Sequence, residues 1–360
     1  MVEIDKINIW NHSTSDSDEL LYATKSDDGI KIFHYPTKNE ITILSSEISA
    51  LAYFKKAENV FLVDWQNNTS EIINTNGEST FKNGRLSKIG NNYIVLNEEN
   101  QSTIFDNNFQ LIQTIHKTPN HYQLNFKDNV IFYLTDSSGK GQITNSRSKL
   151  FKYSLTTDLF EEFVDATKYS WTEETERKSG FICQLIGQYD EGLICQISKY
   201  RLVCFDIRTK SVIWELNDFV SNKELYKYLA FGESTTARTP MNWHLSESDG
   251  FAHLLSRHFY WRLNLRTQKV ELLADYTEQS PLERWNFTKT TLFNNKIIFV
   301  GSKGFSSTPN YLGVFDLIMH QVIWEQKIEN GSIMGEPNVF GEEYVTIVDS
   351  NKNMYIFKLN

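Results

Sequence analysis

A strand–turn–strand phrase recurs along this chain and limits the folds that it can adopt. The phrase is complete at Arg201–Leu216, RLVCFDIRTKSVIWEL, and at Tyr311–Ile328, YLGVFDLIMHQVIWEQKI, and a degraded copy lies at Phe259–Leu273. An Asp that ends the first strand accepts hydrogen bonds from the turn, and a Trp in the second strand supplies a large apolar surface. Hairpins that recur at intervals of about 40–45 residues are typical of radial β-arrays. The repeat therefore predicts an all-β propeller.

Groups of four short strands extend this pattern over residues 1–360 as a single domain. We count about eight four-stranded blades, with seven as the alternative. The last group, Glu336–Leu359, has only three strands, so we expect the N-terminal strand Ile4–Trp10 to complete it and remove a sheet edge. The first group, after a polar loop at Asn11–Glu19, would then lack one strand. A capping box at Ser221–Glu224 predicts one short helical insertion near 221–230.

The composition narrows the class of partner. Aromatic residues make up 14% of the chain, and only 6 residues are Pro. Both values favour folded β-structure over disorder. The net charge of −9 disfavours nucleic acid as a partner; it suits a basic protein partner or simply keeps the chain soluble. The start, MVEIDKINIW, does not resemble a signal peptide, and no apolar run is long enough to span a bilayer. With Cys183, Cys195 and Cys204 read as buried free thiols, we expect a cytoplasmic protein that is monomeric on its own.

The two full copies of the phrase share one order of residues. The order is strand, Asp, turn and Trp, with Phe205, Asp206 and Trp214 in one copy and Phe315, Asp316 and Trp324 in the other. It resembles the PQQ-like β-propeller repeats of quinoprotein dehydrogenases and of the bacterial outer-membrane assembly lipoprotein. The resemblance covers about half of the blades and concerns the fold alone. The sequence shows neither the adjacent cysteines that grip the dehydrogenase cofactor nor a lipid-attachment leader, so neither activity is carried over and we expect no cofactor.

Motifs for catalysis and metal binding are absent or incomplete in this sequence. No nucleophile elbow, P-loop or dinucleotide fingerprint is present. Asp349, Asn351 and Asn353 imitate the start of a calcium loop, but Met354 stands where that loop needs Gly, so we expect no metal. The acidic run at 173–176 contains three Glu residues that could pair for acid–base chemistry, but a mixed-charge run is more typical of a solvated loop tip.

The long connections all belong to one face of the predicted propeller. In a four-stranded blade, connections between strands two and three, and between successive blades, emerge on the same face. The long connections of these two kinds are Asp136–Ser148, Thr167–Ser179, Asp218–Pro240, Tyr276–Trp285 and Ser302–Asn310. Turns of the opposite face, such as Arg208–Lys210, are tight. Long loops on one rigid face favour a binding surface, and the alternative is a set of neutral insertions.

We therefore expect a non-catalytic propeller that binds a protein partner through its long loops, for example a bacterial immunity-type inhibitor of a toxin. Candidate anchors are the aromatic and basic residues of those loops, because such residues dominate interface energies. They are Arg147, Trp171, Arg177, Tyr226, Arg238, Trp285, Lys303 and Phe305. Two alternatives stay open: a glycosidase- or lyase-type enzyme at the mouth of the central channel, and a scaffold subunit of a larger complex.

Overall fold

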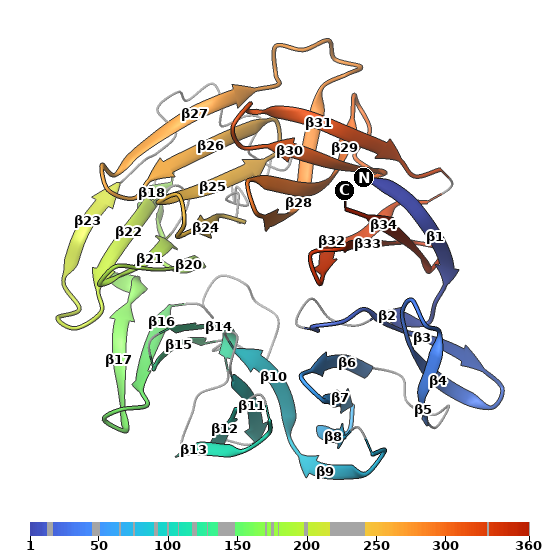
Figure 1. The fold of residues 1–360 in the computed structure, drawn as a ribbon. Helices are drawn as coiled ribbons and strands as arrows, with labels where there is room; N and C mark the ends of the chain where they lie inside the picture. Colours follow the sequence, from blue (N-terminus) through green and yellow to red (C-terminus); the bar gives the residue numbers. More distant parts are fainter. Residues whose placement is uncertain are drawn as a thin grey trace.

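The chain forms a ring of eight four-stranded antiparallel sheets around a central channel (Figure 1). The computed structural model describes residues 1–12, 17–44, 51–64, 66–74, 76–89, 93–98, 101–106, 108–116, 121–127, 129–135, 148–169, 171–173, 176–178, 180–197, 201–216, 242–329 and 331–359. Within this part of the chain the only helix is the 3-10 turn η1 (Ala166–Lys168). The predicted all-β propeller is confirmed, and its blades number eight.

The blades follow one another in chain order, and each begins at the channel. From the channel outward, blades 1 to 4 contain β2 (Asn11–His12), β3 (Leu21–Ser26), β4 (Gly29–His34) and β5 (Asn39–Leu44); β6 (Leu51–Lys56), β7 (Asn59–Asp64), β8 (Thr69–Ile73) and β9 (Ser79–Asn83); β10 (Arg85–Ile89), β11 (Tyr93–Glu98), β12 (Gln101–Phe105) and β13 (Leu111–His116); and β14 (His121–Lys127), β15 (Val130–Thr135), β16 (Lys149–Ser154) and β17 (Leu159–Asp165).

Blades 5 to 8 continue the same arrangement. They contain β20 (Ile182–Tyr189), β21 (Gly192–Ile197), β22 (Arg201–Asp206) and β23 (Val212–Leu216); β24 (His244–Ser246), β25 (Phe251–Ser256), β26 (Phe259–Asn264) and β27 (Lys269–Asp275); β28 (Trp285–Phe293), β29 (Lys296–Lys303), β30 (Tyr311–Asp316) and β31 (Gln321–Lys327); and β32 (Ile333–Phe340), β33 (Tyr344–Asp349), β34 (Asn353–Lys358) and β1 (Val2–Asn8).

The N-terminal strand closes the ring, as predicted. The β1 strand pairs with β34 from Val2 opposite Lys358 to Asn8 opposite Asn353, and both termini lie at this blade (Figure 1). The expectation that blade 1 lacks a strand is wrong. The two residues of β2 pair with Ala23 and Tyr22, so the N-terminal segment supplies the outer strand of blade 8 and the inner strand of blade 1.

The repeated Asp and Trp have the roles that the sequence predicts. The Asp316 carboxylate accepts hydrogen bonds from the backbone N–H groups of Ile318 and Met319, both at 2.8 Å, and closes the β30–β31 turn. Asp206 does the same in the β22–β23 turn. Trp214 of blade 5 packs on the apolar cluster that blade 6 shares with it, and Trp324 of blade 7 packs on the cluster shared with blade 8.

The core of the molecule is a set of apolar layers between neighbouring blades. The described residues contain eight buried clusters, and each cluster joins two consecutive blades around the ring. The layer between blades 5 and 6 contains the buried side chains of Trp243 and Trp261, and replacing a buried Trp by Ala typically costs about 3–5 kcal/mol. This packing makes the ring a rigid support for the loops on its two faces.

The structure bears differently on three local predictions: the loop at 167–179, the helix near 221–230 and the three cysteines. Residues 167–179, predicted as a loop, contain the end of η1 and the hairpin of β18 (Trp171–Glu173) and β19 (Glu176–Lys178), so that prediction is wrong. The helix predicted near 221–230 lies outside the described residues. Cys183, Cys195 and Cys204 are buried free thiols, and burial raises the pKa of Cys204 to about 12. In the described part of the chain, no helix is long and apolar enough to cross a bilayer.

Candidate functional site

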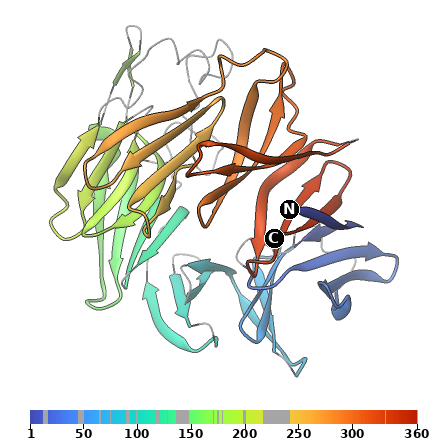
Figure 2. The same ribbon diagram turned by 45° about the horizontal axis from the view of Figure 1, so that its top comes forward.

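In blades 4 to 7 the two faces of the ring differ in the length of their connections. We call one the long-loop face; it carries the β17–β20 connection (166–181), the β27–β28 connection (276–284) and the β29–β30 loop (304–310). The opposite, tight-turn face carries short turns such as 207–211 and 317–320. Figure 2 shows the β18–β19 hairpin and the β27–β28 connection rising on the same side of the ring. The hairpin forms a separate two-stranded sheet that belongs to no blade.

Two of the predicted anchors lie on this extra hairpin. Trp171 pairs with Lys178, and Thr172 pairs with Arg177, so Trp171 and Arg177 lie on facing strands of one hairpin, one position apart in the pairing. The side chains of these two residues lie outside what the structure describes. Arg147, Tyr226 and Arg238 also lie outside the described residues, and their role as anchors stays a prediction.

Trp285 is not an accessible anchor, and that prediction is wrong. The residue begins β28 and its side chain is only 3% exposed. Its ring packs edge-on against Phe299 at 5.1 Å and Tyr311 at 5.4 Å between ring centroids, within the apolar layer between blades 6 and 7. The sequence analysis places Trp285 at the end of the Tyr276–Trp285 connection, whereas the strand already begins at this residue and its ring packs in the core.

Lys303 covers the buried indole from the solvent side. Its ammonium group lies 4.6 Å from the ring centroid of Trp285 and forms an ion pair with Glu325. A cation held over an aromatic ring and paired with a carboxylate is already engaged within the protein. Lys303 therefore lies at the rim of the long-loop face with a partly satisfied charge.

Phe305 is a predicted anchor that the structure shows at the surface. Its side chain is 84% exposed, the highest value among the large apolar residues described, and the neighbouring Leu282 is 71% exposed. The two loops touch, because the backbone N–H of Gly304 donates to the carbonyl of Arg284 at 2.9 Å. A Cβ at Gly304 would lie 2.9 Å from the carbonyl oxygen of Leu282, so glycine is required for this approach. Sequence reasoning missed Leu282, although an apolar residue after Pro281 in a polar loop was a visible signal.

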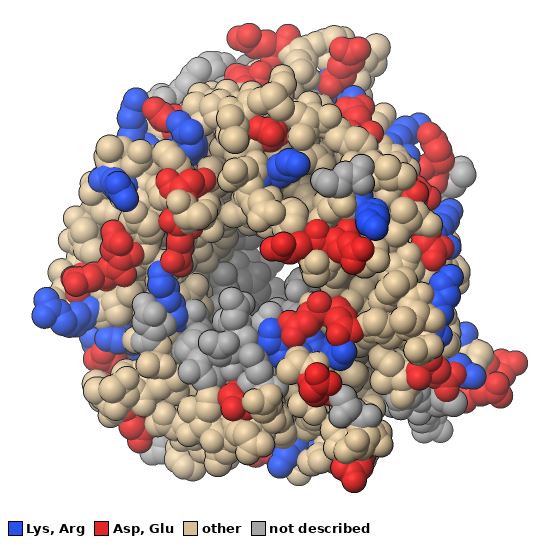
Figure 3. Space-filling view, viewed as in Figure 1, with Lys and Arg blue, Asp and Glu red and all other residues tan. Residues whose placement is uncertain are grey.

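The channel wall between blades 5 and 8 contains a cavity of about 570 Å³. Its lining comes from β20, β28, β32 and the start of blade 6. The lining residues are Ile186, Trp243, His244, Leu245, Thr290, Thr291, Leu292, Glu336, Pro337, Asn338 and Val339. Figure 3 shows the channel as a hollow near the centre of the tight-turn face, with acidic side chains along part of its rim.

Most polar groups of this cavity hold neighbouring inner strands together. His244 Nε2 lies 2.8 Å from Thr290 Oγ1, and burial lowers the pKa of His244 to about 4, so the ring is neutral at pH 7. The Thr291 hydroxyl donates to the carbonyl of Pro337 at 2.6 Å, which joins β28 to β32. These contacts explain the polar residues of the wall as parts of the scaffold.

Glu336 is the one carboxylate in this lining. It lies in a bulge of β32, where three residues between Met334 and Asn338 face a single residue of β33. The carboxylate reaches channel water, yet the walls remove part of its hydration and raise its pKa, an effect that Lys289 partly opposes. A glycosidase mechanism canonically uses two carboxylates, and the described lining supplies one.

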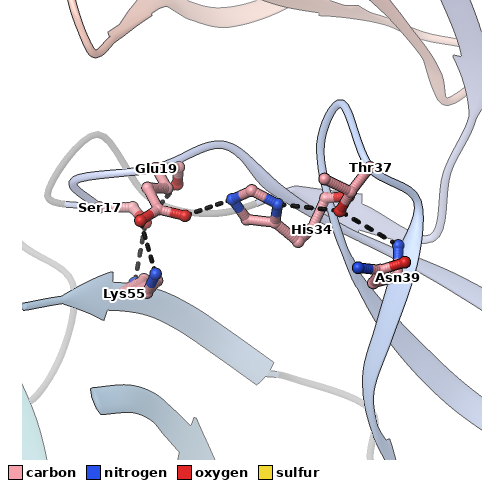
Figure 4. Close-up of polar contacts among 6 residues, drawn as sticks. All are labelled: Ser17, Glu19, His34, Thr37, Asn39 and Lys55. Carbon is pink, nitrogen blue, oxygen red and sulfur yellow. Dashed lines mark hydrogen bonds and ion pairs between the residues drawn. The ribbon is translucent and has the colours of Figure 1, made fainter. Parts of the chain in front are cut away.

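The tight-turn face carries a polar cluster between blades 1 and 2, shown in Figure 4. Glu19 pairs with His34 of its own blade and with Lys55 of blade 2, at 2.5 Å from the ammonium group. Burial opposes the ionisation of Glu19, but the hydrogen bonds and charges of Lys55 and His34 outweigh it and lower its pKa. His34 Nδ1 lies 3.1 Å from the hydroxyl of Thr37, which also accepts from the Asn39 backbone. We interpret the cluster as a contact between blades, since its groups bind one another.

The residues that imitate a calcium loop form an ordinary turn. The Asp349 carboxylate accepts hydrogen bonds from the backbone N–H groups of Asn351 and Asn353 and from the hydroxyl of Tyr355 at 3.1 Å. Its oxygens are therefore used inside blade 8. Among the described residues, no three His, Cys, Asp or Glu side chains form a group that could hold a metal ion.

Comparisons with known proteins identify the fold. No family model and no curated protein matches the sequence. Among solved structures, Sqt1 from Saccharomyces cerevisiae matches with a TM-score of 0.61 at 7% identity over 100% of both chains. The C-terminal WD40 domain of Sif2 matches with a TM-score of 0.57 at 11% identity, over 99% of this chain and 98% of that one. The computationally designed protein Ika8 matches with a TM-score of 0.53 at 12% identity over 99% of both chains. These likenesses show a β-propeller fold and leave the PQQ-like family unassigned.

Proposed function

We propose that this protein is a non-catalytic β-propeller that binds a protein partner through its long-loop face. The observation that carries the proposal is the uneven distribution of chain length. In blades 4 to 7 the long connections all lie on one face, where they include the separate β18–β19 hairpin, and the connections of the other face are short. Extra chain held on a rigid ring is the usual location of binding residues.

Surface chemistry supports the same face. It exposes Phe305, the most exposed large apolar residue described, together with Leu282. Among the described turn residues of the tight-turn face, the exposed large apolar side chains are those of Ile318 and Met319 in the β30–β31 turn, and neither is aromatic. The polar groups of the channel cavity mostly bind one another. Aromatic side chains that project from rigid loops are typical anchors of protein interfaces. The whole-chain charge of −9 favours a partner with a basic surface.

Two forms of this function are compatible with the face. An immunity-type inhibitor would cover the active surface of a bacterial toxin and block its activity. A scaffold subunit would hold its partner without blocking the partner's activity. They are distinguished by one measurement, the partner's activity in the presence of saturating propeller. Loss of activity assigns the inhibitor, and full activity in the complex assigns the scaffold.

The test begins with affinity purification of the partner, its identification by mass spectrometry, and calorimetric titration of the two purified proteins. We expect Trp171→Ala and Arg177→Glu each to weaken binding about 10-fold or more while the melting temperature stays nearly unchanged. The matched control is Arg208→Glu in the exposed β22–β23 turn of the tight-turn face. Lys210 is a poor control because its ammonium group binds Glu161 of blade 4 at 2.6 Å. Loss of binding from Arg208→Glu alone would show that the interface lies on the tight-turn face and that the proposed face is wrong.

A further inference from the structure

Two exposed apolar residues of blade 7 are held in a fixed position. Leu282 and Phe305 come from separate connections of the long-loop face, and the Gly304–Arg284 hydrogen bond joins the two connections. Each connection is also tied internally. Arg284 Nη2 donates to the carbonyl of Thr277 at 2.7 Å, and the Ser302 hydroxyl donates to the carbonyl of Ser306 at 2.6 Å.

This rigidity matters for binding. An exposed Leu or Phe is unremarkable by itself, since folded proteins expose much apolar surface. A pair whose backbone is already positioned loses less conformational entropy when a partner covers it than a pair on loose loops, so more of the interaction appears as affinity. We name Leu282 and Phe305 the blade 7 knob.

The exposed charges around the knob are mostly acidic. Glu278 and Glu283 lie in the same connection as Leu282 and are exposed. Among the described residues neither takes part in an ion pair, whereas Lys303 is paired with Glu325. Arg284 keeps its positive charge, but its guanidinium is held inside the connection by a backbone carbonyl. The two exposed carboxylates outnumber this single cation. The knob is therefore an apolar pair with an acidic border.

We propose that the blade 7 knob is the anchor of the interface, and that it is covered by a basic segment of the protein partner with apolar side chains toward Leu282 and Phe305 and Lys or Arg side chains toward Glu278 and Glu283. This inference rests on the proposed function and specifies its chemistry. The apolar contact supplies most of the affinity, and the carboxylates select a basic partner and speed its association. An anionic membrane surface is disfavoured because the same carboxylates are repelled by it.

The chain offers a matched control on the same blade. Ile318 and Met319 in the β30–β31 turn are 73% and 55% exposed, and they lie on the tight-turn face. For the charges, Glu58 and Glu342 are exposed carboxylates in tight turns of that face. Each pair of substitutions at the knob therefore has a counterpart that removes the same kind of group from the opposite face.

The probe is a displayed library of random 12-residue peptides, selected on the immobilised full chain at low salt. We expect the recovered peptides to combine Lys or Arg with apolar residues. Leu282→Ser with Phe305→Ser should weaken their binding about 10-fold or more, and Glu278→Lys with Glu283→Lys about 3- to 10-fold with a flatter salt dependence. Ile318→Ser with Met319→Ser, and Glu58→Lys with Glu342→Lys, should change Kd by less than about 2-fold. If the double variant Leu282→Ser with Phe305→Ser unfolds, the single variant Phe305→Ser replaces it in the binding measurement.

Several results would overturn the inference. In the peptide selection, these results are recovery of acidic peptides, recovery of peptides that bind the knob variant equally well, and recovery of no peptides. In a flotation assay, the result is binding of the protein to vesicles of phosphatidylcholine and phosphatidylserine, if the knob variant abolishes that binding. If Trp171→Ala and Arg177→Glu abolish binding of the purified partner but the knob variant still binds it, the proposed function stands and the inference fails. If only the tight-turn variants weaken the partner, both fail.

Discussion

At the scale of single residues, His244 makes the ring sensitive to acid. Its folded-state pKa is about 4 because burial disfavours the charged ring, whereas an unfolded histidine has a pKa of about 6.5. The unfolded state therefore binds the proton more readily between these values. The stabilising contribution is fully present above pH 6.5 and is lost as the pH falls through the window from 6.5 to 4, by up to about 3 kcal/mol.

The substitution His244→Gln tests this account. Glutamine can keep a hydrogen bond to the hydroxyl of Thr290 but does not titrate, so the variant should lose less stability than the parent between pH 7 and pH 4.5. The measurement is the urea midpoint at both pH values. Part of the acid sensitivity should remain, because burial also lowers the pKa of His253 and His258. Equal pH dependence in parent and variant would rule out His244 as a contributor.

At the scale of elements, the Asp of the repeated phrase fixes the turn that it precedes. Asp316→Ala removes two hydrogen bonds to backbone N–H groups in the β30–β31 turn, whereas Asp316→Asn keeps an acceptor in the same place. We expect the Ala variant to lose about 1–2 kcal/mol of unfolding free energy and the Asn variant clearly less. Denaturant unfolding measures both. Equal losses would mean that the charge of the carboxylate, and not its position as an acceptor, stabilises the turn.

The same scale shows what the sequence could predict. Strands of five or more residues with alternating apolar side chains, and turns closed by Asp, were readable because both patterns are local. The β2 strand was not, since two residues cannot show alternation, and β18 and β19 were hidden in a charged run. The burial of Trp285 depends on contacts with Phe299 and Tyr311, which only the folded ring brings together. The loops that carry Leu282 and Phe305 touch at Gly304, a contact that no spacing in the sequence encodes.

At the scale of the whole molecule, the ring depends on one strand from the opposite end of the chain. The β1 strand covers the edge of β34, and the next residues continue into the apolar layer between blades 8 and 1, where Ile9 is buried beside Phe340 and Ile356. Without β1, the row of backbone groups on β34 loses its partners and becomes a free sheet edge. Closure therefore stabilises the eighth blade and protects the protein from association through that edge.

Deletion of residues 1–8 tests closure. We expect the melting temperature to fall by more than about 5 °C, equivalent to a few kcal/mol, and the truncated chain to associate on size exclusion. Addition of a synthetic peptide of residues 1–8 should restore part of the lost melting temperature, because it can pair again with β34. A scrambled peptide of the same composition is the control. An unchanged melting temperature after deletion would mean that the contacts between blades hold the ring closed without the shared strand.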